Sequence, residues 1–451
     1  MNYLFLTVLL VIFNSISAFA QCANEPKIEQ TGKIIAVREF TVKDKSNEMI
    51  LTLEVAANNS SWAKVGAEGA TLTVFVDGKY NQDVMLFGGA KEFVYQVALG
   101  SFEQGKRALA VTFNQTRSAK NSKEAKIYSV KIASANLSDK NSADTIALAN
   151  SPIIYARPDT IDKFSDIPLV LYYEVFPNGD DAFKIRYTTI FSNEDGGTQT
   201  AALMARWGRA TDIEWVYEIE FSGGKIVSEI YQGANHETKN YAGKRVFGGH
   251  PLVFNTTVNN NFSDAGCSDL RFAPLAVRAD LSKKSRETVM DENGWTYRIM
   301  AEELLREKRI NAAKLDANTI ADPRDYIYAE IYSEPENAAI NVEAETFGGE
   351  KFSSDAGIAS LRVSRKGYVR IAMRLPRMKT ADFPSSVIVG CYPVSNDAAA
   401  RNGACQNVRV IKLVRLDENY QPIVEKIESP PQNIKVGGKA VFAISERKSR
   451  E

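Results

Sequence analysis

TLTVFVDGKYNQDVML, residues 71–86, contains two strand-like apolar runs on either side of Asp77-Gly78. Successive side chains of a strand point to opposite faces of the sheet, so alternation of this kind is typical of a half-buried strand. An Asp-Gly pair between two such runs is a strong hairpin signal, because both residues tolerate the positive φ of a type I′ turn. The stretch therefore predicts an antiparallel hairpin inside a β domain.

The pattern continues on both sides of this hairpin, over residues 31–135. Apolar residues alternate from Phe93 to Leu99 and again from Leu109 to Phe113, with no helical periodicity between them. Short strands at this spacing predict a β-sandwich domain, which we assign to residues 21–145.

The rest of the chain is also mainly β. Residues 150–318 combine alternating segments with long loops rich in Asn and Gly, and one helix is predicted at 297–315. Alternation returns over 322–446, as in GYVRIAMRLPR (367–377), and predicts a second sandwich. The predicted fold class is all-β and multidomain, with β-sandwich-like N- and C-terminal domains flanking a loop-rich central β domain with one helix.

Composition excludes one class of partner. The 451 residues include 55 Lys and Arg and 55 Asp and Glu, so the formal net charge is zero. Without a global positive field or an obvious basic patch, we expect no nucleic-acid partner.

The N-terminus predicts export. An apolar run from Tyr3 to Phe13 is followed by Ala18-Phe19-Ala20, which fits a signal peptide over residues 1–20 with cleavage before Gln21. We therefore expect a secreted or periplasmic protein, with lipid anchoring at Cys22 as the alternative. No later apolar run is long enough for a membrane span, so we expect no transmembrane segment after cleavage.

Export permits disulfide bonds. Cys391 and Cys405 bracket a polar loop between two strand-like segments, and we predict that they pair and clip this loop. The partners of Cys22 and Cys267 stay open.

The only two histidines, His236 and His250, lie in HETKNYAGKRVFGGHP (236–251). They are candidates for general acid–base catalysis or, with a third ligand such as Glu237, Asp264 or Asp269, for a metal site. Their separation is outside the HExxH spacing. The alternative is a glycine-shaped loop whose histidines form hydrogen bonds with its own backbone.

A second candidate is RWGRATDIEW (206–215). Arg206 and Arg209 beside Trp207 are suited to a carboxylate, sulfate or phosphate, because guanidinium groups donate bidentate hydrogen bonds. Alternatively, the two arginines pair with Asp212 and Glu214 and have a structural role.

Two acidic turns form the third candidate, SNEDGGT (192–198) and NNNFSDAGCSD (259–269). Asp195 and Asp269 could ligate Ca²⁺, although neither turn has EF-hand spacing and turn chemistry alone explains the composition. A pair of carboxylates for glycoside hydrolysis could be drawn from Glu194, Asp195, Asp212, Glu214 and Asp264. The sequence identifies no cofactor, and it has no GxSxG, P-loop, CxxC or helix-opening GxGxxG motif.

We therefore expect a secreted protein that binds a glycan or another polar ligand through its central domain. Its ligand-binding candidates are Arg206, Trp207, Arg209 and Asp264. One alternative is a secreted hydrolase, whose catalytic candidates are His236, His250, Asp212 and Glu214. A second alternative is an envelope or surface structural protein.

Overall fold

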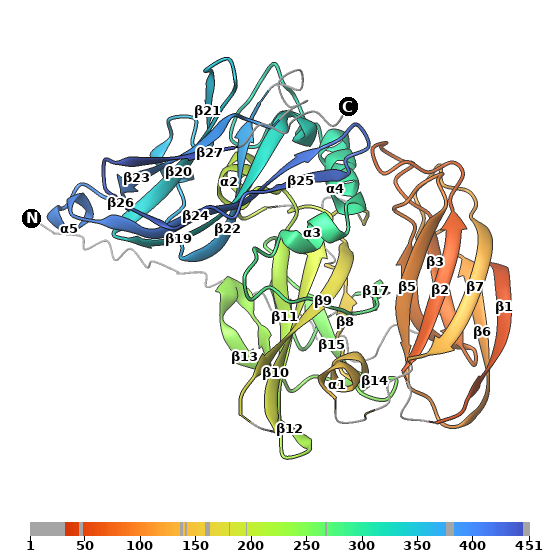
Figure 1. Cartoon of the computed structure of the whole chain (residues 1–451). Coiled ribbons are helices and arrows are strands. Elements are labelled where there is room, and N and C mark those ends of the chain that lie inside the picture. Colours follow the sequence, from red (N-terminus) through yellow and green to blue (C-terminus); the bar gives the residue numbers. More distant parts are fainter. Residues whose placement is uncertain are drawn as a thin grey trace, which may run out of the picture.

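The computed structural model describes residues 32–44, 48–135, 139, 142–157, 163–179, 181–194, 196–266, 268–375 and 383–444. The predicted signal peptide, Cys22, Asp195 and Cys267 lie outside these residues. Strands dominate the described part of the chain and form six sheets, which confirms the all-β fold class (Figure 1). We name three regions by their residues: the N-terminal region (32–135), the central region (142–321) and the C-terminal region (322–444).

The N-terminal region contains two sheets that enclose a common apolar core. The predicted hairpin is confirmed, with Asp77 and Gly78 at φ values of 50° and 73° in its turn. In spatial order the first sheet contains β1 (Lys33–Val42), β6 (Gly105–Phe113), β3 (Thr71–Val76) and β4 (Lys79–Met85), and the second contains β5 (Phe93–Gly100), β2 (Met49–Ala56) and β7 (Lys126–Ser134).

The central region is built on a six-stranded sheet that packs one face against a smaller sheet. Ile185, Tyr187, Tyr217 and Ile219 on that face are buried against the smaller sheet. On the other face, which we call the open face, Tyr172 and Ile190 are buried in the large core and the part around Arg186 is partly exposed. The large sheet contains β13 (Thr238–Asn240), β12 (Lys225–Gln232), β11 (Ile213–Ser222), β10 (Ala182–Phe191), β9 (Pro168–Pro177) and β18 (Val277–Arg278). The smaller sheet contains β14 (Arg245–Val246), β15 (His250–Asn255), β8 (Ile153–Tyr155) and β17 (Arg271–Phe272), with β16 (Phe262–Ser263) paired to β15.

The helices of the central region differ from the single predicted one. The helix expected at 297–315 is α4 (Trp295–Arg306), and its predicted second half was wrong. The chain turns away at Lys308, whose φ is 60°, and the Arg309 side chain then donates to Thr200 at 3.1 Å. Three helices too short for a periodicity window were missed: α1 (Ala143–Ala149), α2 (Thr200–Trp207) and α3 (Thr288–Glu292). No helix among the described residues has the length and apolar content needed to cross a bilayer.

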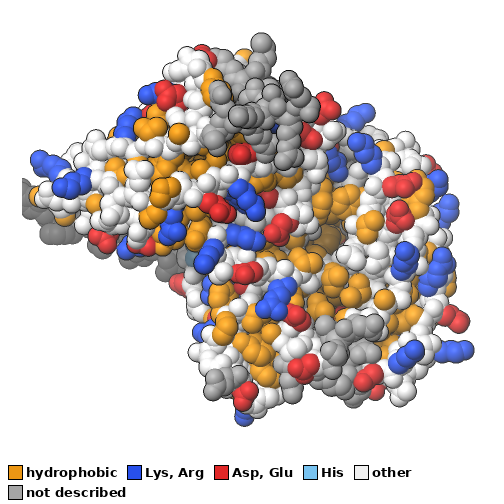
Figure 2. Space-filling model, viewed as in Figure 1, with side chains coloured by type: hydrophobic (Ala, Val, Ile, Leu, Met, Phe, Trp, Pro, Cys, Tyr) orange, Lys and Arg blue, Asp and Glu red, His pale blue; other side chains and the backbone are white. Residues whose placement is uncertain are grey.

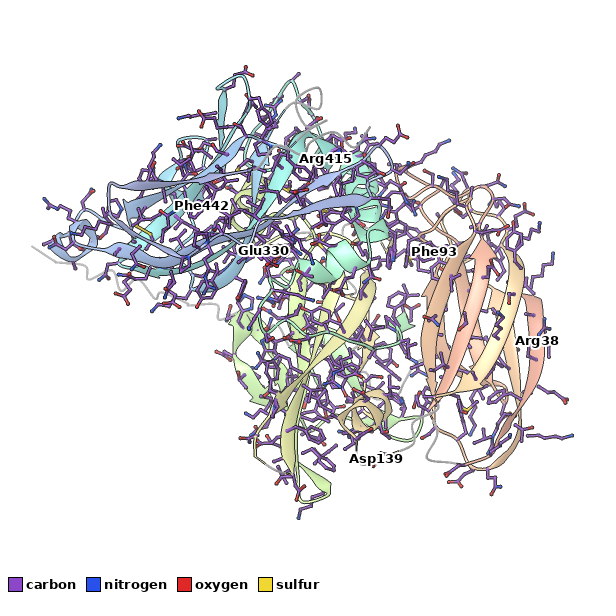
Figure 3. The ribbon with its side chains drawn as sticks, in the orientation of Figure 1. Arg38, Phe93, Asp139, Glu330, Arg415 and Phe442 are labelled. Atoms are coloured by element: carbon purple, nitrogen blue, oxygen red, sulfur yellow. A yellow bond between two sulfur atoms is a disulfide. The ribbon has the colours of Figure 1, made fainter. Side chains whose placement is uncertain are left out.

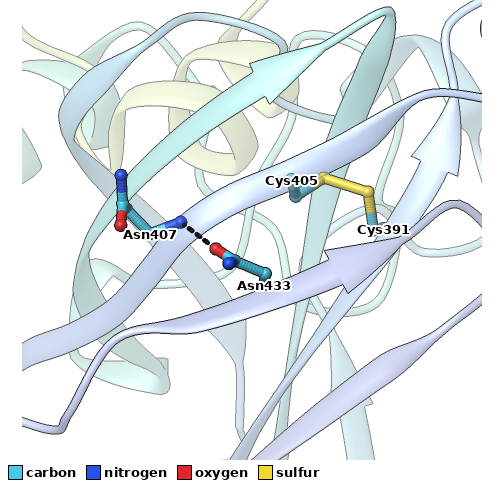
Figure 4. The surroundings of a disulfide bond; sticks show 4 residues. All are labelled: Cys391, Cys405, Asn407 and Asn433. Carbon is cyan, nitrogen blue, oxygen red and sulfur yellow. Dashed lines mark hydrogen bonds between the residues drawn. A yellow bond between two sulfur atoms is a disulfide. The ribbon is translucent and has the colours of Figure 1, made fainter.

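The C-terminal region is a second pair of sheets with its own core. One sheet contains β22 (Gly367–Arg374), β19 (Tyr326–Glu336), β24 (Ala404–Leu416), β25 (Pro422–Lys426) and β26 (Gln432–Lys435), and the other contains β21 (Lys351–Ser353), β20 (Ala338–Glu345), β23 (Ser386–Pro393) and β27 (Lys439–Ala443). A short helix, α5 (Ala398–Arg401), lies between β23 and β24. The predicted disulfide is present: Cys391 on β23 and Cys405 on β24 are buried and join the two sheets (Figure 4).

A continuous apolar core and a buried ion network join the three regions. The core runs from the N-terminal sheets through α4 to Tyr328 of the C-terminal region. The ion network joins α3 to the C-terminal sheet: Arg370 contacts Asp291 at 2.7 Å and Glu330 at 3.1 Å, and Lys412 contacts Asp291 at 2.8 Å. Figure 3 shows Glu330 at this junction. These contacts place the open face of the central sheet beside the C-terminal region.

Candidate functional site

The structure separates the two histidines. His250 is buried at the start of β15, where its Nδ1 lies 2.8 Å from the Ser151 carbonyl and its Nε2 lies 3.1 Å from the Glu48 carboxylate. Burial lowers the pKa of His250, but the Glu48 carboxylate outweighs this effect and the pKa is raised above its ordinary value. Because Glu48 belongs to the N-terminal region, this geometry favours a structural link between regions over catalysis.

His236 lies at the surface instead, with its side chain 52% exposed. It ends the 3₁₀ turn Ala234–His236 and has a φ of 60°. Its Nδ1 lies 3.1 Å from Gln232 Nε2 and 3.8 Å from a Glu214 oxygen, and its Nε2 lies 3.0 Å from Asn259 Nδ2. Of the two histidines, only His236 therefore contacts the predicted carboxylates.

Three of those carboxylates, Glu194, Asp212 and Glu214, lie close together where β10 ends and β11 begins. Burial and then the Asp212 charge raise the pKa of both Glu194 and Glu214 to about 8. Burial also raises the pKa of Asp212, although it accepts a hydrogen bond from Asn260 at 3.0 Å. Carboxyl groups with raised pKa values are potential general acids. Among the described residues, no group of three or more His, Cys, Asp and Glu side chains is arranged to hold a metal ion.

The acidic turns come together only in part. Asn259 of the second turn lies against Gly197 of the first and also contacts His236. Asp264, however, accepts a hydrogen bond from the Ala242 amide at 2.9 Å and stabilises a neighbouring loop. Asp269 lies 3.6 Å from Arg117 of the N-terminal region and is 70% exposed. The structure therefore does not bring Asp264 and Asp269 to one site, and Asp195 lies outside the described residues.

The segment 206–215 divides into a structural half and an open half. Arg209 is buried and pairs with Glu287 at 3.1 Å and with Asp212 at 3.9 Å. Arg206 instead lies over the ring of Trp207, 4.5 Å from its centroid. The alternative of a structural ion pair thus fits Arg209, while Arg206 and Trp207 stay at the surface of the central region.

A β-bulge decides where Trp215 points. Alternation in the sequence of β11 predicts that Trp215 shares a face with Tyr217, Ile219 and Phe221, but the structure places Trp215 on the opposite face. The pairing of β10 and β11 shifts so that Tyr187 faces Tyr217 while its neighbour Thr188 faces Trp215. Val216 is the extra residue and is buried in the core with Tyr217. The bulge therefore re-aims Trp215 to the open face of the sheet.

Trp215 and Trp207 line one groove between this open face and the C-terminal region, which we call the tryptophan groove. Its volume is about 430 Å³, within the range of small-ligand sites. Strands β9, β10 and β11 form its floor, and the segments 281–287 and 365–368 form its walls. The aromatic lining residues are Phe176, Trp207, Trp215 and Tyr368.

Charged side chains surround these rings, with more basic than acidic groups. Arg186 lies 5.3 Å from the Trp215 centroid and pairs with Glu218, while Arg365 lies 4.8 Å from the Trp207 centroid. The basic lining residues are Arg186, Lys284, Arg286, Arg365 and Lys366, and the acidic ones are Glu174 and Glu287.

Sequence reasoning missed most of this groove. Arg186, Arg286 and Arg365 come from three distant segments, and no local motif joins them. The one available signal was the exposed face of the alternating strands that carry Glu174 and Arg186. Of the predicted ligand-binding residues, Trp207 lines the groove, Arg206 lies on its ring, and Arg209 pairs with a groove residue, Glu287. Asp264 lies elsewhere.

A second hollow lies between the N-terminal and central regions. It has a volume of about 290 Å³ and is lined mainly by apolar side chains, including Phe87, Phe93, Tyr95 and Trp295. Figure 2 shows hydrophobic side chains gathered at this junction. Its walls supply few polar groups that could orient a ligand, so the tryptophan groove is the stronger candidate.

Comparisons with known proteins leave the family open. No family model and no curated protein sequence matches the chain. Among solved structures, the C-terminal domain of EclA, described as a sugar-binding protein, is 17% identical with a TM-score of 0.19, over 23% of this chain and 70% of that one. A Pleurotus ostreatus lectin in its apo form is 10% identical with a TM-score of 0.11, over 92% of this chain and 87% of that one. At such TM-scores, neither likeness carries an argument about function, which has to come from the groove itself.

Proposed function

We propose that the chain is a glycan-binding protein that holds its ligand in the tryptophan groove. The observation that carries this proposal is the bulge at Val216, which turns Trp215 out of the core and towards Trp207. A bulge leaves one residue unpaired and disrupts the ladder locally, and bulges often lie beside sites where a side chain has to be re-aimed. An aromatic ring directed into a groove is available to a ligand.

The chemistry of the lining fits a sugar. A pyranose ring has an apolar face of C–H groups and an edge of hydroxyls, so it needs both a flat apolar surface and hydrogen-bonding groups. Trp215 supplies a flat apolar surface, with Phe176 and Tyr368 in the same groove, and Arg186, Glu174 and Thr188 supply hydrogen-bonding groups. Predicted export is consistent with recognition of a glycan outside the cytoplasm.

Binding to a panel of neutral and acidic oligosaccharides tests the proposal, with titration calorimetry on every oligosaccharide that binds. Trp215→Ala is expected to weaken binding at least tenfold, because stacking on an aromatic ring is lost. The matched control is Tyr128→Ala, since Tyr128 is also an exposed ring, with Lys126 4.5 Å from its centroid, but lies on β7 of the N-terminal region. The proposal fails if no oligosaccharide binds or if W215A binds as tightly as the wild type.

A hydrolase is the second candidate, and one observation favours it. Glu194 and Glu214, with pKa values raised to about 8, would be protonated at neutral pH, as a general acid must be. The same oligosaccharides are therefore incubated with the protein and their products analysed. If the wild type cleaves an oligosaccharide, and Glu214→Gln still binds it but no longer cleaves it, the protein is a glycosidase and not only a binding protein.

A further inference from the structure

We propose that the ligand of the tryptophan groove is anionic, an acidic glycan whose carboxylate or sulfate group is held at Arg365 with Arg286 nearby. This inference rests on the proposed function and narrows its ligand class. It comes from the imbalance of charge along the groove and from the groups that its arginines contact.

The groove is lined by five basic and two acidic side chains, so the acidic residues cannot neutralise all the basic ones. Glu287 is buried and already pairs with Arg209, which lies outside the lining. Lys284 and Lys366 form only long contacts, 3.7 Å to Glu292 and 4.0 Å to Glu336. Exposed pairs at such distances contribute little, so a positive potential persists in the groove.

Arg365 shows the imbalance most clearly. Its guanidinium donates to the Arg206 carbonyl at 2.7 Å, a neutral acceptor, and has further N–H groups to donate. Burial lowers the pKa of Arg365 to about 10, because the attraction of Glu287 is offset by repulsion from Arg209, Arg286 and Arg206. An anion placed beside this guanidinium relieves the repulsion.

Arg286 gives the site a second donor. Its side chain is exposed in the groove wall and donates to the Ile213 carbonyl at 2.9 Å. In the described part of the chain, neither Arg286 nor Arg365 forms an ion pair with a carboxylate. Two guanidinium groups close to aromatic rings match a sugar ring that carries an acidic substituent, because bidentate hydrogen bonds recognise planar carboxylates and sulfates.

Matched ligand pairs test the inference. Oligogalacturonate is compared with its methyl ester, which keeps the sugar rings but removes the charge, and a sulfated oligosaccharide is compared with its desulfated form. In each pair that binds, the anionic member is expected to bind at least tenfold more tightly, because one charge-assisted hydrogen bond contributes at least that factor in affinity. This preference should shrink in about 0.5 M NaCl, where charges are screened beyond about 4 Å.

Arg365→Met is expected to abolish the preference for the anion, and Arg365→Lys to restore part of it. The control is Arg38→Met, which removes the same charge from an exposed position on β1 of the N-terminal region (Figure 3). If R365M does not fold, the anion preference of R365K and the salt dependence of the wild type test the inference instead.

The outcomes separate the two proposals. Equal affinities for the charged and neutral members overturn the anionic ligand and leave the glycan-binding proposal standing. Failure of every oligosaccharide to bind overturns both. Displacement of the bound oligosaccharide by a single-stranded oligonucleotide at lower concentration would also overturn the inference, because the site would then prefer a phosphate backbone.

Discussion

Arg365 and Arg370 are five residues apart, at the entrance to β22 and within it, yet their surroundings are opposite. Arg370 is fully buried and contacts two carboxylates, Asp291 and Glu330, within a network that also contains Lys412. Arg365 lies in the tryptophan groove, donates to a backbone carbonyl and is surrounded by other arginines. One environment is balanced in charge and closed, and the other is basic and open.

The difference distinguishes Arg370, whose charge has a structural role, from Arg365, whose charge we propose to bind a ligand. Burial lowers the pKa of Arg370, but Asp291 and other neighbours outweigh it, so the pKa is raised well above its ordinary value. The pKa of Arg365 is lowered, because burial and like charges prevail. A buried cation that its neighbours stabilise needs nothing more, whereas a cation whose attraction to Glu287 does not outweigh burial and like charges is stabilised further by an anionic ligand.

The largest expected effect is that of Arg370→Met compared with Arg365→Met. Among the described residues, R370M leaves Lys412 as the one cation that pairs with the buried Asp291 and Glu330, beside neutral hydrogen-bond donors such as Ser285 and Tyr297. It should therefore reduce the free energy of unfolding by about 3–5 kcal/mol. R365M removes a repelled charge and should leave the free energy of unfolding unchanged or slightly higher. Urea denaturation of both variants measures the contrast.

The proposed difference between Arg365 and Arg370 is contradicted if R365M is as destabilised as R370M, because Arg365 would then have a structural role. The contrast is supported if added sulfate raises the melting temperature of the wild type and of R370M by more than that of R365M, since a ligand stabilises the folded state that binds it and the non-specific effect of sulfate is common to all three proteins.

The two histidines provide a smaller version of the same contrast. His250 is enclosed and holds Glu48 and the Ser151 carbonyl, so His250→Ala should cost about 1–3 kcal/mol by leaving buried polar groups unsatisfied. His236 is half exposed, and His236→Ala should change the free energy of unfolding by less than about 0.5 kcal/mol. Thermal melts of the two variants check this prediction, and equal losses would contradict it. Neither substitution should affect binding in the tryptophan groove.

The sequence predicted the fold better than the site, for physical reasons. Alternation and the Asp77-Gly78 turn are local, and they correctly indicated strands and the all-β class. The pairing of Cys391 with Cys405 followed from two strand-like segments around a short loop. Helix α4, in contrast, was predicted too long. The chain leaves the helix after Arg306 and turns at Lys308, whose φ is 60°, and apolar periodicity does not show this turn.

The candidate site depends on strand register and on packing between regions, which involve residues far apart in the sequence. Trp207 was a candidate from the sequence and lines the groove, but the direction of Trp215 depends on a bulge that alternation cannot show. The alternation in GYVRIAMRLPR places Arg370 opposite the apolar side of its strand, and the structure agrees, but the face that Arg370 occupies is buried against α3. Whether such a face is covered or open depends on how the regions pack against one another, and sequence periodicity does not predict this packing.

The last and smallest effect concerns pH, because the carboxylates also divide into two groups. Arginine contacts outweigh burial at Asp291 and Glu287 and lower their pKa values, so their contribution to stability is present above the ordinary pKa and is lost as pH falls. Burial and crowding raise the pKa values of Glu194 and Glu214 to about 8. In the folded chain these two groups keep protons that the unfolded chain releases near their ordinary pKa, so the stability they contribute is lost as pH rises through about 8.

The melting temperature is therefore expected to fall by a few degrees between about pH 5 and about pH 9. Glu194→Gln, which cannot ionise, should flatten this fall, because one crowded charge is removed. The control Glu237→Gln changes an exposed carboxylate in the neighbouring loop and should follow the wild type. A melting temperature that rises over this range, or a slope in E194Q as steep as in the wild type, would mean that these carboxylates are ionised at neutral pH. That result would also remove the one observation that favours a hydrolase, because a carboxylate already ionised at neutral pH has no proton to donate to a leaving group.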